Sequence, residues 1–119
     1  MVNGFIINLN VNKNNEKIED YIERIFNTWK DGIPKIHFSS PKDKKNKRSH
    51  NDYINSDDFI DFIEKIKFTK RDFDVMIEAK KKDDALFRLI RELKYKTNYK
   101  IEKNTINLFL RNRVLVFLD

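Results

Sequence analysis

The chain has 119 residues, of which 39% are hydrophobic and 37% charged, a composition that suits one ordinary domain with a core and excludes wholesale disorder. The formal net charge of +6 suits a polyanion partner such as nucleic acid, although a solvated basic surface explains it equally well. The sequence contains no cysteine, no signal-peptide pattern and no apolar run near the ~20 residues of a membrane span, which excludes disulfides and thiolate metal sites and predicts a soluble, cytoplasmic protein.

The first half of the chain alternates strand-like and helix-like segments. Residues 5–9 (FIINL) form an apolar run of strand length, and residues 18–30 (IEDYIERIFNTWK) place their apolar side chains at helical spacing. Gly32 and Pro34 end this helix before a second predicted strand, which lies within PKIHFSS (34–40).

The same order continues after a long polar loop. Ser56 is the predicted N-cap of a helix over 57–66 (DDFIDFIEKI). Residues 73–79 (FDVMIEA) alternate like a strand, and residues 83–94 (DDALFRLIRELK) return to helical spacing. Strand followed by helix, three times over, predicts an α/β fold with parallel strands and right-handed crossovers.

Residues 105–119 fit this pattern less well. Ile106, Leu108 and Leu110 alternate like a strand, residues 114–118 (VLVFL) form another apolar run, and no helix follows. We therefore divide the chain into an α/β part, 1–104, and an atypical apolar tail, 105–119. Three strand–helix units fall short of a flavodoxin-like sheet of about five strands and of a (β/α)8 barrel of about 250 residues. They would leave long open sheet edges, so the chain is expected to be a piece of something larger.

Three side chains that could bind a metal are predicted to meet at one edge of the sheet. His37 lies near the end of the second strand, Glu78 at the end of the third, and His50 in the loop after the second strand. Ligands of parallel α/β folds bind at these carboxyl ends, and imidazole with carboxylate suits zinc, manganese or iron. Taken singly, a strand histidine is also a common hydrogen-bonded core residue, and a glutamate ending a strand is usually solvated.

Lys35 lies two residues before His37 and therefore on the same side of the strand. A lysine ammonium beside metal ions would repel them. A neutral lysine could be a ligand, and a carbamylated lysine could bridge metals because addition of CO2 converts the cation into a carboxylate. The alternative is a surface lysine whose stem packs on the sheet while its charge reaches water.

A basic loop leaves the same strand end and could contact phosphates beside such a site. Its cations are Lys42, Lys44, Lys45, Lys47 and Arg48. Tyr53 follows and could stack on a base. An ordinary solvated loop with an aromatic anchor explains the pattern equally well.

Three ordered blocks, PKIHFSSP, RSHNDYINSDDFIDFIE and FDVMIEAKKKDDALFRLIREL, closely resemble the C-terminal part of the UV DNA damage endonuclease family, over roughly residues 16–95. The resemblance implies a TIM barrel related to endonuclease IV, of which this chain would supply roughly the last three strand–helix units. It implies a nuclease that nicks double-stranded DNA immediately 5′ of UV photoproducts with a cluster of divalent metals, manganese or zinc being expected.

The resemblance also implies roles for individual residues. His37 and His50 resemble metal-ligand histidines, Glu78 resembles the carboxylate ligand of the last strand, and Lys35 matches a lysine that the family carries in carboxylated form. One departure stands out: an Asp-x-x-His pair of ligands is expected on the strand before KIH, where this chain has Asn8 and Asn10. Neutral amides are weak ligands for these metals.

We therefore expect a C-terminal fragment of such an endonuclease, inactive alone and completed by a missing N-terminal barrel segment. The alternative is a basic nucleic-acid-binding or assembly fragment without catalysis, whose binding would weaken steeply with salt. A third reading is a remnant that folds only with a partner segment.

Overall fold

The computed structural model describes residues 7–10, 22–40, 52–69, 71–108 and 112–118, with only the backbone described at 7–10. The elements in chain order are β1 (Ile7–Asn10), α1 (Ile22–Phe26), β2 (Lys35–Ser39), α2 (Ser56–Ile66), β3 (Phe73–Glu78), α3 (Lys82–Lys96), β4 (Lys100–Glu102), β5 (Thr105–Asn107) and β6 (Arg113–Leu118). None of the described helices is long and apolar enough to cross a membrane.

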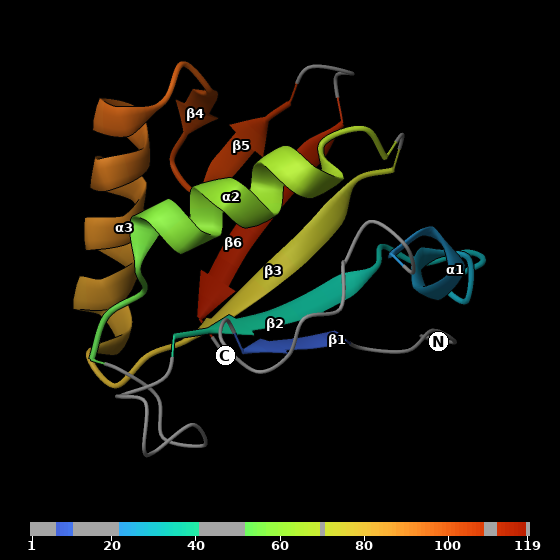
Figure 1. The fold of residues 1–119 in the computed structure, drawn as a ribbon, viewed down its shortest axis with the longest axis horizontal. Helices are drawn as coiled ribbons and strands as arrows, with labels where there is room; N and C mark the ends of the chain where they lie inside the picture. The colour runs from blue at the N-terminus through green and yellow to red at the C-terminus, as the bar shows by residue number, and fades with distance from the viewer. Residues whose placement is uncertain (1–6, 11–21, 41–51, 70, 109–111, 119) are drawn as a thin grey trace.

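The strands form one mixed sheet of six in the order β1-β2-β3-β6-β5-β4 (Figure 1). β1, β2, β3 and β6 are parallel neighbours, whereas β5 runs antiparallel to both β6 and β4. The predicted α/β class is therefore confirmed, and the three predicted strands are parallel neighbours in sequence order.

One face of the sheet carries the hydrophobic core. Side chains at alternate positions of the central strands are almost completely buried there: Ile36, Phe38, Phe73, Val75, Ile77, Val114 and Val116. Figure 1 shows α2 crossing this face between α1 and α3. The Phe38 ring lies 5.2 Å from that of Phe59 and 5.3 Å from that of Phe62, so two rings of α2 close over β2.

The residues that follow α3 belong to the same sheet and core. β6 pairs with β3 from Phe73 opposite Val114 to Ile77 opposite Leu118, and Ile106 of β5 is buried with Val114. The proposed boundary after residue 104 thus separates no structural unit, and the edge of β3 that the sequence left open is covered by β6. The division by family likeness stays a prediction.

The start of α2 differs from the predicted one. Asn55, not Ser56, is the N-cap: its side-chain oxygen accepts a hydrogen bond from the Asp58 amide at 3.0 Å. Ser56 is the first residue of the helix, and its hydroxyl group lies 2.7 Å from Nζ of Lys96, which donates to it. An asparagine oxygen reaches the third amide of a helix as readily as a serine hydroxyl, so both residues were suitable caps.

Arg71 fixes the turn that leads from α1 into β2. Its guanidinium group donates to the carbonyl oxygens of Phe26, Trp29 and Gly32, the last at 2.8 Å. These bonds satisfy carbonyl groups left over at the end of a short helix. Arg71 thereby ties the start of β2, and the side chains that β2 carries, to the start of β3.

Candidate functional site

The candidate site lies on the sheet face opposite the core. Because side chains alternate along a strand, burial of Ile36 and Phe38 against the helices turns Lys35 and His37 to the other face. The register places Lys35 opposite Asp74 and Ser39 opposite Glu78. Polar groups of both strands therefore share this face, as the sequence predicted for Lys35 and His37.

His37 and Glu78 form a pair across β2 and β3. Nδ1 of His37 lies 2.7 Å from Oε1 of Glu78, and the two side chains are 19% and 21% exposed. They are diagonal neighbours, because Glu78 stands two residues beyond the partner of His37, Met76. A carboxylate that accepts from Nδ1–H selects the tautomer with the lone pair on Nε2, the atom a metal or proton would take.

Lys35 and Asp74 form a second pair on the same face. Nζ of Lys35 donates to Oδ2 of Asp74 at 2.7 Å, and the Asp74 side chain is only 10% exposed. The carboxylate thus gains a cation where little water is left to solvate it. Asp74 was not predicted as a site residue, although it shares its side of β3 with Glu78, four residues further on, and this spacing was the available signal.

The His37–Glu78 pair offers donor atoms of the kind that bind a divalent metal, but two ligands are too few for a metal site. Imidazole nitrogen and carboxylate oxygen are the donors that zinc and manganese take. Among the residues that the structure describes, no group of three or more histidine or acidic side chains is placed to hold a metal ion. A site built on this pair needs further ligands from elsewhere.

β1 occupies the position from which additional ligands were expected. Its backbone places Asn8 opposite His37 and Asn10 opposite Ser39. The strand therefore runs beside the candidate site, while its sequence offers neutral amides at these positions.

Several predicted site residues lie outside the described residues: His50 and the basic residues Lys42, Lys44, Lys45, Lys47 and Arg48. Tyr53 is described, and the guanidinium group of Arg88 lies 4.5 Å from the centre of its ring. This stack holds Tyr53 against α3, and its predicted contact with a base stays a prediction.

Fold and site together define an α/β protein with a candidate site across two parallel strands. Glu78 ends β3 at the carboxyl edge, the usual place for ligands in such sheets, while His37 lies in the middle of β2 and Lys35 and Asp74 lie near the starts of the two strands. The family model for the UV-endonuclease UvdE matches residues 6–108, so the chain belongs to this family. The match includes every residue of the two pairs described above and continues through β5.

Curated relatives carry the name UV DNA damage endonuclease. The Bacillus pumilus protein is 48% identical over 81 residues, which make up 66% of this chain and 25% of the relative. The Bacillus mycoides and Bacillus cereus proteins are 42% and 41% identical over similar segments. The chain therefore matches about a quarter of each of these relatives, and no solved structure gave a significant match.

Proposed function

We propose that the chain is the C-terminal part of a metal-dependent endonuclease that incises double-stranded DNA 5′ of UV photoproducts. The observation that carries this proposal is the His37–Glu78 pair, 2.7 Å apart across two neighbouring parallel strands in a chain of the UvdE family. The names of the relatives support the substrate class.

The arrangement of β1, β2 and β3 supports a segment of a (β/α)8 barrel. The three strands are parallel neighbours in sequence order, and one core unites β2 and β3 with residues of α1, α2 and α3. A doubly wound sheet would place helices on both faces, whereas a barrel keeps all of them outside. The face with His37 would then be the barrel interior. β6 occupies the edge of β3 that the first strand of a closed barrel would occupy.

In this proposal His37 and Glu78 hold a divalent metal together with His50. Such a metal, when bound, lowers the pKa of a water ligand and polarises a phosphodiester. Glu78 orients the imidazole ring through Nδ1, or turns to become a ligand itself. The basic residues at 42–48 hold the DNA backbone through its phosphates.

Lys35 has two candidate states in this site. In the structure its ammonium group pairs with Asp74, and a carbamate at the same place would instead face that carboxylate. We propose that carbamylation of Lys35 accompanies metal binding. The ammonium group first loses a proton to solvent, the neutral amine then forms a C–N bond to CO2 and releases a second proton, and a bound metal would supply the positive charge that the lysine gives up. Carbon-13 NMR with labelled bicarbonate should show a carbamate signal when zinc is added and none without metal. Zinc is used in place of manganese because manganese broadens nearby resonances. Its persistence in a Lys35→Arg variant would assign the signal to another group.

A chimera tests the proposed function. In it, residues 16–95 of this chain replace the matching segment of the Bacillus pumilus relative. The relative then supplies the rest of the protein, including its own strand in place of β1. We expect the chimera to nick UV-irradiated duplex DNA with manganese present, and His37→Ala or Glu78→Gln to reduce the rate by at least a hundredfold. Lys65→Gln, an exposed change on α2, is the matched control and should leave the rate unchanged.

A folded chimera without incision activity would refute the proposed function. The chain by itself is expected to be inactive, and metal-dependent nicking by the chain alone would contradict that part of the proposal.

A further inference from the structure

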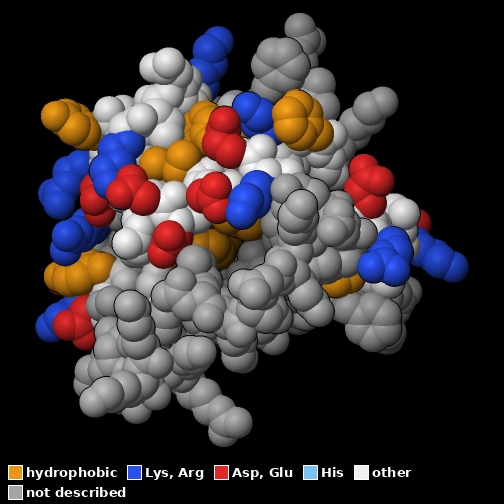
Figure 2. Space-filling view, in the orientation of Figure 1, with side chains coloured by type: hydrophobic (Ala, Val, Ile, Leu, Met, Phe, Trp, Pro, Cys, Tyr) orange, Lys and Arg blue, Asp and Glu red, His pale blue; other side chains and the backbone are white. Residues whose placement is uncertain are grey.

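The outer face of α3 combines aromatic rings and cations. Ala85, Leu89 and Leu93 face the core, so the opposite side of the helix points to solvent. This side, which we call the α3 outer face, consists of Phe87, Arg88, Arg91, Lys94 and Tyr95. In Figure 2, hydrophobic and basic side chains, with acidic ones among them, lie along the left edge, where α3 runs.

The two rings of this face are unusually exposed. Phe87 is 69% and Tyr95 91% exposed, and among the described residues only Ile33 and Phe68 are other large hydrophobic side chains of this kind. The rings stand eight residues apart on one helix, which is about 12 Å along its axis. Exposed rings at that spacing offer two flat platforms to one extended ligand.

The cations beside the rings lack carboxylate partners. Within the part of the chain that the structure describes, Arg91, Lys94 and Lys103 form no ion pair. In contrast, Nε of Arg88 lies 3.3 Å from Glu92, and Nζ of Lys96 lies 3.1 Å from Asp57. Arg88 of the outer face is therefore paired with a carboxylate, whereas Arg91, Lys94 and the nearby Lys103 carry positive charge that no described carboxylate neutralises.

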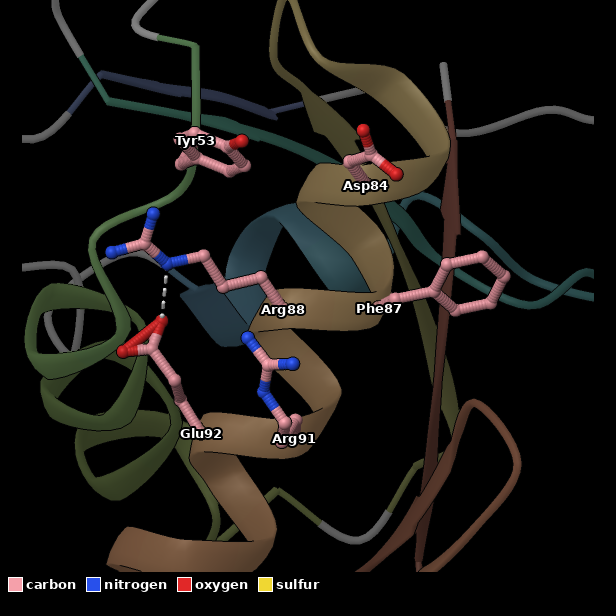
Figure 3. A pocket seen from close by; sticks show the side chains of 6 residues that line it. All are labelled: Tyr53, Asp84, Phe87, Arg88, Arg91 and Glu92. Carbon is pink, nitrogen blue, oxygen red and sulfur yellow. Dashed lines mark hydrogen bonds and ion pairs between the residues drawn. The ribbon is translucent and has the colours of Figure 1, made fainter.

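Two hollows flank the ridge formed by Phe87 and Arg91. One, of about 580 Å³, has Leu86 and Ile90 among its lining residues and Lys94 and Lys103 as further cations, with no carboxylate. The other, of about 490 Å³, contains the Arg88–Tyr53 stack and is also lined by the carboxylates of Asp84 and Glu92, so the hollow without a carboxylate is the better place for phosphates. Figure 3 shows the Phe87 ring pointing away from that stack, with the Arg91 side chain between them.

We propose that the α3 outer face binds single-stranded nucleic acid. Bases would stack on Phe87 and Tyr95, and the phosphates between them would contact Arg91, Lys94 and Lys103. A single strand fits better than a duplex, because duplex bases hide the faces that these rings would cover. Aromatic rings rather than aliphatic side chains as the exposed apolar groups favour bases over an acidic peptide. The site goes beyond the proposed incision of duplex DNA and needs no metal.

Fluorescence anisotropy with a labelled 12-nucleotide single strand of mixed sequence, in EDTA, measures this binding. The double variant Phe87→Ser/Tyr95→Ser should weaken it at least tenfold, because stacking on one ring contributes about fivefold or more. The double variant Arg91→Gln/Lys94→Gln should lower the salt slope by about 1.4, the value for two phosphate contacts on a single strand. Phe68→Ser/Lys65→Gln, an exposed ring and cation near the end of α2, is the matched control and should bind like the parent.

Three results would each overturn the proposal. The first is an equal loss of binding in the control variant, and the second is tighter binding of the same sequence as a duplex. The third is stronger competition by an acidic peptide than by unlabelled single strand. Urea unfolding of each variant shows whether it is folded, and all six substitutions are at exposed or half-exposed positions. His37→Ala should leave single-strand binding intact. An inactive chimera with intact single-strand binding would therefore refute the nuclease proposal alone, and the reverse result would refute this one alone.

Discussion

Val116→Ala tests whether β6 is part of the core. Val116 is 0% exposed and stands opposite Val75, which is equally buried. The substitution removes two buried carbon atoms, at about 0.8 kcal/mol each before any cost of the cavity. We expect the free energy of unfolding to fall by about 2 kcal/mol.

Leu115→Ala is the control, because Leu115 is the preceding residue of the same strand and lies half-buried on the other sheet face. It loses three carbon atoms, yet it should cost less than Val116→Ala. Urea denaturation followed by circular dichroism gives both values, provided that the slope of free energy against urea is unchanged. A loss for Leu115→Ala that equals or exceeds the loss for Val116→Ala would refute the assignment of the core to the helical face.

Two further predictions concern α2. Asn55→Ala should lower the free energy of unfolding in urea by about 1 kcal/mol, because the Asp58 amide loses its cap. Asn55→Asp keeps a capping oxygen and should be nearly neutral. An equal loss of stability in both variants would exclude capping as the cause. The Tyr99 hydroxyl donates to Glu64 at 2.6 Å, and this bond, with Lys67 next, lowers the pKa of Glu64. A carboxyl group whose pKa is lower in the folded state than in the unfolded state stabilises the fold above its unfolded-state pKa, and this stability is lost as the pH falls through its folded-state pKa. Tyr99→Phe should therefore lower the free energy of unfolding by about 0.5 kcal/mol at neutral pH. The value is small because Glu64 is largely exposed. The loss should shrink when unfolding is measured below pH 4, and a loss constant with pH would contradict the assignment to Glu64.

The sequence was informative wherever a local period decides the structure. Alternation at Ile36 and Phe38 sets which face of β2 is buried, and so places Lys35 and His37 together without any knowledge of the rest of the fold. The same reasoning brought Glu78 to the end of the neighbouring strand, where it lies 2.7 Å from His37. The Lys35–Asp74 contact needed the register between the strands, which no local pattern contains.

The place of β4, β5 and β6 was not predictable from local signals. The turn between β4 and β5 contains Lys103 with φ of 54°, a backbone region that glycine or asparagine usually marks. Because lysine stands at this position, no local signal marks a tight hairpin. The pairing of β6 with β3 joins residues far apart in the chain, so the apolar run at 114–118 carried no information about its partner.

The position of β6 also has a consequence for how the chain folds. β6 is the last described element, yet it lies inside the sheet between β3 and β5. Pairing β6 with β3 brings Val114 opposite Phe73, and long-range strand pairing of this kind forms more slowly than local contacts. Until it forms, the inner edge of β3 offers unpaired backbone groups to other molecules. Pairing of β6 with β3 therefore also protects an edge that is open to other chains during folding.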